Sequence, residues 1–287
     1  SPWPAGLLYH RSNRNRALTE KVIPYIMKRY VATETRSGNP GDPELMQFAA
    51  EAGVSYVLRR DRSIARIMAE EEADGVIVWK QEGPVLDLGG ERFFYHPSMG
   101  KNRVSQIRKG HSDPMIEAMG LKRGWEVLDC TLGLGADALV VSFVVGDEGR
   151  IVGVESSPVT AAIVRWGIKK YSKGPAWLKA AMDRIEIICA DHLEVLKQLP
   201  ARSFDIVYFD PMFRHPIKSS CAISPLRQLA DHRPLTEEAI AEALRVSRSR
   251  VVLKERVGST EFERLGFKPV FTGEHRDIAY GIIEAGS

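Results

Sequence analysis

The chain has 287 residues, of which 44% are hydrophobic and 27% charged, and its formal net charge is +3. This length accommodates one large or two modest domains, and the composition is that of an ordinary globular protein with a substantial core. No apolar run approaches the ~20 residues of a membrane span, and the first residues lack the apolar core of a signal peptide. We therefore expect a cytoplasmic protein without a membrane partner.

Positive charge gathers in two segments. Residues 1–29 form a basic arm with six Arg or Lys side chains against the single acid Glu20, and a second basic run covers residues 101–109. Such clusters can bind the phosphates of nucleic acids, but a solvated helix face is at least as common an explanation. RNA is therefore a candidate partner that charge alone does not establish.

Residues 30–96 are predicted to form a small α/β domain. Short apolar segments separated by Gly/Pro turns predict strands at 30–35, 54–58, 75–79, 85–88 and 92–95, and helices at 43–52 and 63–72. Residues 97–124 then form a helical connector, with predicted helices at 98–109 and 114–119. The sequence alone indicates no role for the small domain.

Residues 125–287 show a regular alternation of strands and helices. Strands are predicted at 126–130, 151–155, 185–189, 205–209, 250–254, 268–272 and 278–283, and helices at 136–145, 158–171, 193–199, 236–244 and 260–264. This alternation predicts a doubly wound, mostly parallel α/β sheet that binds ligands at the carboxyl ends of its strands.

The first of these strands leads into a glycine turn. The turn Gly133-Leu-Gly135-Ala-Asp-Ala138 satisfies the spacing G-x-G-x-x-G/A of dinucleotide-binding loops. Asp129 precedes the turn and Asp137 follows it, so two carboxylates would repel a pyrophosphate but suit a ligand with ammonium and sulfonium charges. The charges therefore favour S-adenosylmethionine, while the glycine spacing alone also fits a nicotinamide-dependent oxidoreductase.

Each of the first four strands ends in or just before an acid, namely Asp129, Glu155, Asp191 and Asp210. A single acid after a strand is usually a turn former or a helix cap, but four at one edge of a sheet indicate a site. Glu155 lies 20 residues beyond Gly135, the spacing at which a carboxylate accepts hydrogen bonds from ribose hydroxyls. Asp191 is placed to meet the amino edge of an adenine ring.

The segment Asp210-Pro-Met-Phe213 is the most specific chemical signal. It resembles the (Asp/Asn/Ser)-Pro-Pro-(Tyr/Phe) motif of methyltransferases that modify exocyclic or amide nitrogens. Asp210 and the carbonyl of Pro211 could accept the two N–H bonds of such an amine and direct its delocalised lone pair at a methyl group, while Phe213 stacks on the base. The plainer alternative is a turn after a strand, with Phe213 in the core.

Three separated motifs resemble the RsmJ family of small-subunit rRNA guanine-N2 methyltransferases. They are the glycine loop from Asp129 to Asp137, the segment from Asp210 to His215, and His275-Arg-Asp-Ile278. The resemblance implies a class I methyltransferase fold, Rossmann-like with an antiparallel C-terminal strand, that uses S-adenosylmethionine to methylate a guanine amino group in 16S rRNA of the small ribosomal subunit.

Carried onto this sequence, the resemblance also implies a set of cofactor contacts. Together with the loop residues Asp129, Gly133 and Gly135, the expected cofactor contacts are Ala136, Asp137, Glu155, Ser156, Asp191, His192 and Asp210, and the expected catalytic segment is Asp210, Pro211, Met212 and Phe213. Ala136-Asp137 and Asp191-His192 stand where the family has Arg-Asp and Ser-Ser, so a sister branch of the family is also compatible.

Several alternatives remain open. Lys254 ends the fifth strand and could face the acceptor, but a surface charge explains it equally well. The histidines show no metal-ligand spacing and the three cysteines no C-x-x-C pair, so we expect no metal and buried free thiols. An N-methyltransferase of small molecules or proteins, and a non-catalytic RNA-binding module, are the rival functions. The sequence does not indicate the oligomeric state.

Overall fold

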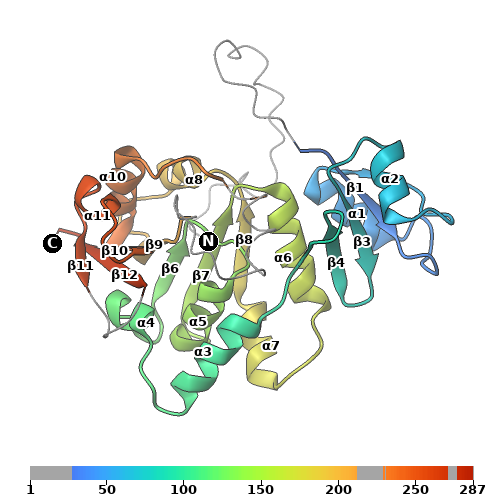
Figure 1. Cartoon of the computed structure of the whole chain (residues 1–287). Coiled ribbons are helices and arrows are strands. Elements are labelled where there is room, and N and C mark those ends of the chain that lie inside the picture. Colours follow the sequence, from blue (N-terminus) through green and yellow to red (C-terminus); the bar gives the residue numbers. More distant parts are fainter. Residues whose placement is uncertain (1–27, 212–228, 230, 271–276, 287) are drawn as a thin grey trace, which may run out of the picture.

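The computed structural model describes residues 28–211, 229, 231–270 and 277–286. Two β-sheets lie side by side, a five-stranded sheet near the N-terminus and a seven-stranded sheet formed by the rest of the chain (Figure 1). No helix of the described residues has both the length and the apolar character that a membrane crossing needs.

The small sheet has the strand order β2-β1-β3-β4-β5. Its strands are β1 (Tyr30–Glu34), β2 (Ser55–Tyr56), β3 (Gly75–Lys80), β4 (Gly83–Asp87) and β5 (Arg92–Phe94), and its helices are α1 (Pro43–Ala52) and α2 (Ile64–Glu70). The carboxylate of Asp42 caps α1 by accepting hydrogen bonds from the N–H groups of Glu44 and Leu45. Each of these elements lies where the sequence predicts it.

The connector forms the helices α3 (Ser98–Arg108) and α4 (Pro114–Met119). Both pack on the large sheet's part of the molecule. Val104 of α3 and Met115 of α4 are fully buried in the same core as Leu139. In α3, Gly100 approaches α5 so closely that a Cβ atom there would lie 2.8 Å from the carbonyl oxygen of Ala136. The connector is therefore fixed beside the glycine loop.

The large sheet has the strand order β11-β12-β10-β9-β6-β7-β8. Its strands are β6 (Glu126–Asp129), β7 (Arg150–Glu155), β8 (Ile185–Cys189), β9 (Phe204–Phe209), β10 (Ser247–Arg256), β11 (Lys268–Val270) and β12 (Ile278–Glu284). Strands β6 to β10 pair in parallel, whereas β12 runs antiparallel to both β10 and β11. This is the class I methyltransferase arrangement, and the expected antiparallel C-terminal strand is confirmed.

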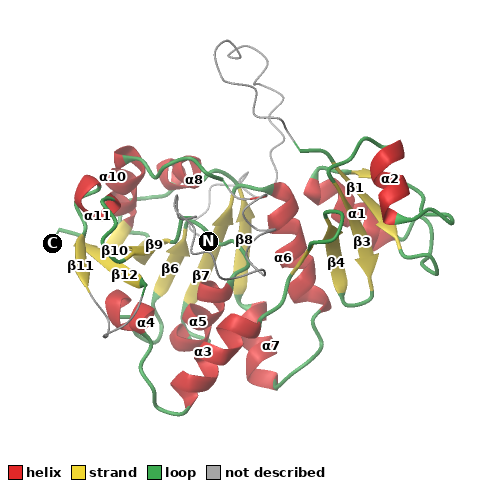
Figure 2. Cartoon of the chain, viewed as in Figure 1, coloured by secondary structure: helices red, strands yellow, loops and turns green. Residues whose placement is uncertain are grey.

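Helices cover both faces of the large sheet (Figure 2). Those of the described residues are α5 (Ala136–Val145), α6 (Pro158–Lys170), α7 (Ala176–Asp183), α8 (His192–Gln198), α10 (Glu237–Val246) and α11 (Glu261–Arg264). One core lies under α5 and α7, and the other under α8, α10 and α11. The sequence analysis assigned no element to α7, because Gly174 and Pro175 marked the segment as a turn. Leu178 and Met182 are nevertheless fully buried and hold this short helix to α5.

Helix α6 joins the two sheets. Val164 and Ile168 belong to the core of the large sheet, whereas Ile163 and Trp166 pack in the core of the small sheet. The rings of Trp166 and Trp79 lie 5.1 Å apart in an edge-to-face arrangement. A helix that is buried on two sides holds the small sheet in a fixed position against the large one.

Candidate active site at the carboxyl ends of the strands

The glycine loop joins β6 to α5 through two residues in the left-handed region. Gly133 has φ 51° and Gly135, the N-cap of α5, has φ 69°, conformations that glycine adopts without strain. Leu132 anchors the loop, since its N–H donates to the carbonyl of Val154 over 3.0 Å and its side chain fills the space above Gly153. The N-terminus of α5 therefore presents backbone N–H groups to this edge of the sheet.

Asp129 ends β6 in a buried position. Its side chain is part of a residue only 2% exposed, and Oδ1 accepts a hydrogen bond from the N–H of Thr131 over 3.0 Å. Burial raises the pKa of Asp129 to about 8, and the neighbouring carboxylates Asp137 and Asp210 act in the same direction. An ammonium group bound at this carboxylate would supply the charge that the site lacks.

Glu155 ends β7 and ties it to the glycine loop. Oε2 accepts from the N–H of Gly133 over 3.1 Å, and Oε1 accepts from the N–H of Ser157 over 2.8 Å. Burial raises the pKa of Glu155 to about 6, although these backbone donors favour the ionised form. Ser156, the next expected contact, is partly exposed at the start of the turn into α6.

Asp191 caps α8, and its carboxylate is already engaged. Oδ1 accepts from the N–H of Leu193 over 2.9 Å, while Oδ2 lies 2.6 Å from the guanidinium of Arg233. The ring of His192 packs edge-to-face against Phe209 at 5.7 Å, and burial lowers the pKa of His192. Both residues lie at the predicted edge, but the helix cap and the ion pair also account for Asp191 in structural terms.

Asp210 lies directly after β9, beside the end of β6. Its N–H donates to the hydroxyl of Thr131 over 2.6 Å, which joins the two strand ends. Oδ2 lies 2.7 Å from Nζ of Lys254. Burial raises the pKa of Asp210 to about 6, against the effect of Lys254. Pro211 follows within the described part of the chain, whereas Met212, Phe213 and the segment from Arg214 to Lys218 lie outside it, as do His275 and Arg276.

Asp137 requires a revision of the charge argument. Its carboxylate contacts Arg103, accepts from the hydroxyl of Tyr208 over 2.8 Å, and lies 3.0 Å from Nζ of Lys254. Burial tends to raise the pKa of Asp137, but Lys254 and Arg103 hold it below its ordinary value. Two cations therefore compensate the negative charge that the sequence suggested for a cationic ligand, which leaves Asp129 as the uncompensated acid at the loop.

Lys254 and Arg103 are the residues that sequence reasoning undervalued. Lys254 bridges Asp137 and Asp210 with its side chain only 16% exposed, so it is not a surface charge. Arg103 comes from α3 and pairs with Asp113 as well as Asp137. The position of Lys254 at the end of a strand was a usable signal, but nothing in the spacing of Arg103 connected it with the glycine loop.

The donor set fits S-adenosylmethionine. Asp129 offers a buried carboxylate for an ammonium group, and Glu155 offers carboxylate oxygens at the end of the second strand, where a ribose would lie. The left-handed glycines leave the loop without side chains that would obstruct a ligand. Among the described residues no group of His, Cys, Asp and Glu is arranged to hold a metal ion.

The free thiols differ from the expectation in one respect. Cys130 is buried, as predicted, whereas Cys189 at the end of β8 is exposed, which contradicts the prediction of a buried thiol there. The alternating pattern of β8 places Cys189 where no helix covers it. Cys221 lies outside the described residues.

Comparison with known proteins identifies the family. The family model SAM_MT, of SAM-dependent methyltransferases, matches residues 94–274. YpiP of Bacillus subtilis is 39% identical over 238 residues, which cover 83% of this chain and 92% of YpiP. Ribosomal RNA small subunit methyltransferase J of Laribacter hongkongensis is 40% identical over 231 residues, 77% of this chain and 73% of that protein. The corresponding protein of Pseudoalteromonas atlantica is 34% identical over 233 residues, 76% of this chain and 86% of that protein.

Among solved structures, a SAM-dependent methyltransferase from Neisseria gonorrhoeae superimposes with a TM-score of 0.62 at 16% identity, covering 89% of this chain and 96% of that chain. At this identity the match concerns the fold. It extends over both sheets, so the small sheet is part of the shared architecture. Fold, family model and relatives agree: the chain belongs to the RsmJ-like family of S-adenosylmethionine-dependent methyltransferases.

Proposed function

We propose that this enzyme methylates the exocyclic amine, N2, of a guanine in the RNA of the small ribosomal subunit. The observation that carries the proposal is the junction of the glycine loop and Asp210. Thr131, two residues after Asp129, accepts the hydrogen bond of the Asp210 N–H, so the methyl-donor loop and the acceptor motif meet on neighbouring strands. The relatives named as ribosomal RNA small subunit methyltransferase J supply the acceptor class.

Asp210 is the residue that we assign to the acceptor amine. Lys254 contacts Oδ2, so we assign one amine N–H to Oδ1 of Asp210 and the other to the carbonyl oxygen of Pro211. A guanine amine is a poor nucleophile because its lone pair is delocalised into the ring, and two acceptors would orient that lone pair. With a pKa of about 6, Asp210 is ionised at neutral pH and can accept without being protonated.

The cofactor supplies an electrophilic methyl group when bound. We assign its ammonium group to Asp129, its ribose to Glu155 and Ser156, and its adenine to Asp191 and His192. Gly133, Gly135, Ala136 and Asp137 form the loop and first helical turn that it would contact, and Met212 and Phe213 complete the acceptor side. These assignments follow the order of the strand ends.

The proposal extends to the organisation of the chain. We assign residues 125–287 to methyl transfer, 97–124 to a connector that contributes Arg103, and 1–29 and 30–96 to RNA recognition. The RNA acceptor places the enzyme in the cytoplasm.

Transfer of a labelled methyl group tests the acceptor class. We expect labelling of undermodified small-subunit rRNA, abolished by ribonuclease and weakened by salt, since contacts to phosphates are salt-dependent. A methyltransferase of small molecules or proteins, the remaining alternative, would label its acceptor after ribonuclease treatment. Family membership no longer supports a nicotinamide-dependent oxidoreductase or a non-catalytic module.

A further inference from the structure

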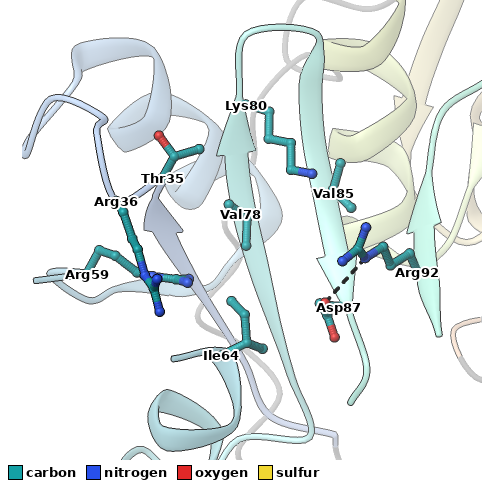
Figure 3. A pocket seen from close by; sticks show the side chains of 9 residues that line it. All are labelled: Thr35, Arg36, Arg59, Ile64, Val78, Lys80, Val85, Asp87 and Arg92. Atoms are coloured by element: carbon teal, nitrogen blue, oxygen red, sulfur yellow. Dashed lines mark ion pairs between the residues drawn. The ribbon is translucent and has the colours of Figure 1, made fainter. Parts of the chain in front are cut away.

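The small sheet carries a positively charged pocket on its outer face. The pocket encloses about 210 Å³ and its lining includes the cations Arg36, Arg59, Lys80 and Arg92. Figure 3 shows Arg36 and Arg59 side by side next to β3, Lys80 above, and Arg92 on the opposite wall. The glycine loop and Asp210 belong to the other sheet, so this pocket is separate from the methyl-transfer site.

The strand pattern explains why the pocket is open. Side chains alternate along β3, so Ile77 and Trp79 face α1 and α6, whereas Val76, Val78 and Lys80 face the opposite side. On that side α2 covers Val76 through Ile67, but it does not extend over Val78 and Lys80. The uncovered half of the sheet face forms the floor of the pocket.

Arg59 is the strongest sign that the pocket binds an anion. The residue is only 8% exposed, and its Nε and Nη1 have no hydrogen-bond partner among the described residues. Burial lowers the pKa of Arg59, and Arg36 beside it adds repulsion. A buried guanidinium without a partner is costly, because it loses hydration and gains nothing in return. A bound anion would remove that cost.

The acid in the pocket does not neutralise these cations. Asp87 lies 3.5 Å from Nε of Arg92 and accepts from the N–H of Gly89 over 3.0 Å. That ion pair, drawn as a dashed line in Figure 3, leaves Arg36, Arg59 and Lys80 as an excess of three positive charges in one pocket.

We propose that this pocket binds a backbone phosphate of the RNA substrate, at a distance from the methylated base. The inference rests on the proposed function. The volume of about 210 Å³ is below the roughly 300–1,000 Å³ of sites for whole small molecules, so it suits one phosphate group with its water better than a nucleotide. Arginine forks match the oxygens of a phosphate, which the excess positive charge attracts.

The orientation of the pocket narrows the RNA further. The face of the small sheet that packs on α6 lies toward the large sheet, and the pocket lies on the opposite face. An RNA that reaches both the pocket and Asp210 must therefore extend around the small sheet. The pocket should matter for a long, folded rRNA and not for a short oligonucleotide around the target base.

Paired charge-removing variants test the proposal. The variant Arg36→Gln/Lys80→Gln loses two charges at the pocket, and the control Arg60→Gln/Arg66→Gln loses two exposed charges of the same domain outside its lining. We expect the pocket variant to bind transcribed small-subunit rRNA about tenfold more weakly, with a salt slope reduced by about one. The control should change little, and the defect in methyl transfer should lie in KM for RNA. Equal effects of the two variants on affinity, or none from the pocket variant, would overturn the proposal.

Substitution of Arg59 gives a second readout. Arg59→Met removes an unpartnered buried charge but keeps the apolar stem, so it should raise the melting temperature by about 2–4 °C while weakening rRNA binding. A destabilised variant with unchanged rRNA affinity would contradict the proposal. If inorganic phosphate stabilises the wild type but not Arg36→Gln/Lys80→Gln, and rRNA affinity is equal in both, the pocket takes a free phosphate and the assignment to RNA is wrong.

These binding measurements do not depend on methyl transfer. If the wild type methylates no RNA, the proposed function fails, while the difference in affinity between the pocket variant and its control still decides whether the pocket contacts RNA. If the wild type methylates rRNA and the two variants bind it equally well, only the pocket assignment fails.

Discussion

Two buried cations, one in each sheet, have opposite surroundings. Lys254 in the large sheet lies between the carboxylates of Asp137 and Asp210, at 3.0 and 2.7 Å. Arg59 in the small sheet has two nitrogens without a hydrogen-bond partner in the described structure and another arginine, Arg36, beside it. The same kind of charge is thus compensated within the protein at one site and left for a ligand at the other.

The difference separates two ways of building a site. At the methyl-transfer edge, the network of Arg103, Asp137, Lys254 and Asp210 fixes the acceptor carboxylate before any substrate binds, which lowers the cost of ordering it later. In the pocket of the small sheet the charge is held in place by burial but not satisfied. Such an arrangement stores a cost that an incoming phosphate relieves.

The largest expected effect is the loss of the paired cation. Lys254→Met leaves Asp137 and Asp210 facing each other without a positive charge, and breaking a buried ion pair in this way costs about 3–5 kcal/mol. Urea unfolding should show this loss at neutral pH. Arg59→Met, which also removes one buried positive charge, should change stability in the opposite direction, so a similar loss in both variants would invalidate the comparison.

Removal of the acceptor carboxylate should affect chemistry more than cofactor binding. In Asp210→Asn the amide can no longer act as an ionised acceptor, and we expect methyl transfer to fall about 10²-fold or more. Transfer is measured with saturating labelled cofactor and rRNA, and binding of S-adenosylmethionine by calorimetry should change much less. Asp61→Asn, an exposed position of the small domain, is the control. Undiminished turnover in Asp210→Asn would remove Asp210 from its assigned role.

The buried acids predict a specific dependence of stability on pH. Asp129 has a folded-state pKa of about 8, above its ordinary 3.8, so the folded protein binds more protons than the unfolded chain between these values. Stability should therefore decrease as pH rises toward 8, by up to about 1.4 kcal/mol per pH unit. Asp210 and Glu155, both near 6, contribute with the same sign mainly at lower pH.

Asp129→Asn isolates the effect of Asp129. Between pH 6 and 8 the free energy of unfolding should decrease less steeply in this variant than in the wild type. Parallel curves over this range would show that Asp129 is ionised in the free enzyme. Added S-adenosylmethionine should also flatten the wild-type curve, since an ammonium group would favour the ionised carboxylate.

The smallest expected effects come from one matched pair of glycines. A Cβ atom at Gly153 would lie 2.5 Å from the side chain of Leu132, and one at Gly75 would lie 2.8 Å from Leu88. Both Gly→Ala variants should lose about 1–3 kcal/mol through overpacking. Only Gly153→Ala displaces the residue that anchors the glycine loop, so it alone should weaken S-adenosylmethionine binding. Equal cofactor affinity in the two variants would show that Leu132 does not position the loop.

Much of the fold could be predicted from the sequence, because local signals agreed with the final packing. Asp42 and the following proline marked the start of α1, and alternating apolar segments marked the parallel strands. The short helix α7 could not be predicted, since its stability comes from Leu178 and Met182 packing on a helix distant in sequence.

The site could be predicted in part. The strand-end positions of Asp129, Glu155, Asp191 and Asp210 follow from strand alternation. The partners of Asp137 do not, because Arg103 and Lys254 are 34 and 117 residues away and only the folded sheet brings them together. The anion pocket was not predicted at all. Its cations come from two strands, a loop and the approach to α2, with no motif to connect them.

Identification of the methylated nucleoside tests the central claim most directly. Undermodified small-subunit rRNA is incubated with the wild-type enzyme and labelled S-adenosylmethionine, digested to nucleosides and analysed by mass spectrometry. We predict label in N2-methylguanosine at one position of the rRNA, greatly reduced with Asp210→Asn. Label in another nucleoside, or in protein or a small molecule with none in rRNA, would contradict the assignment of Asp210 and Pro211 to a guanine amine.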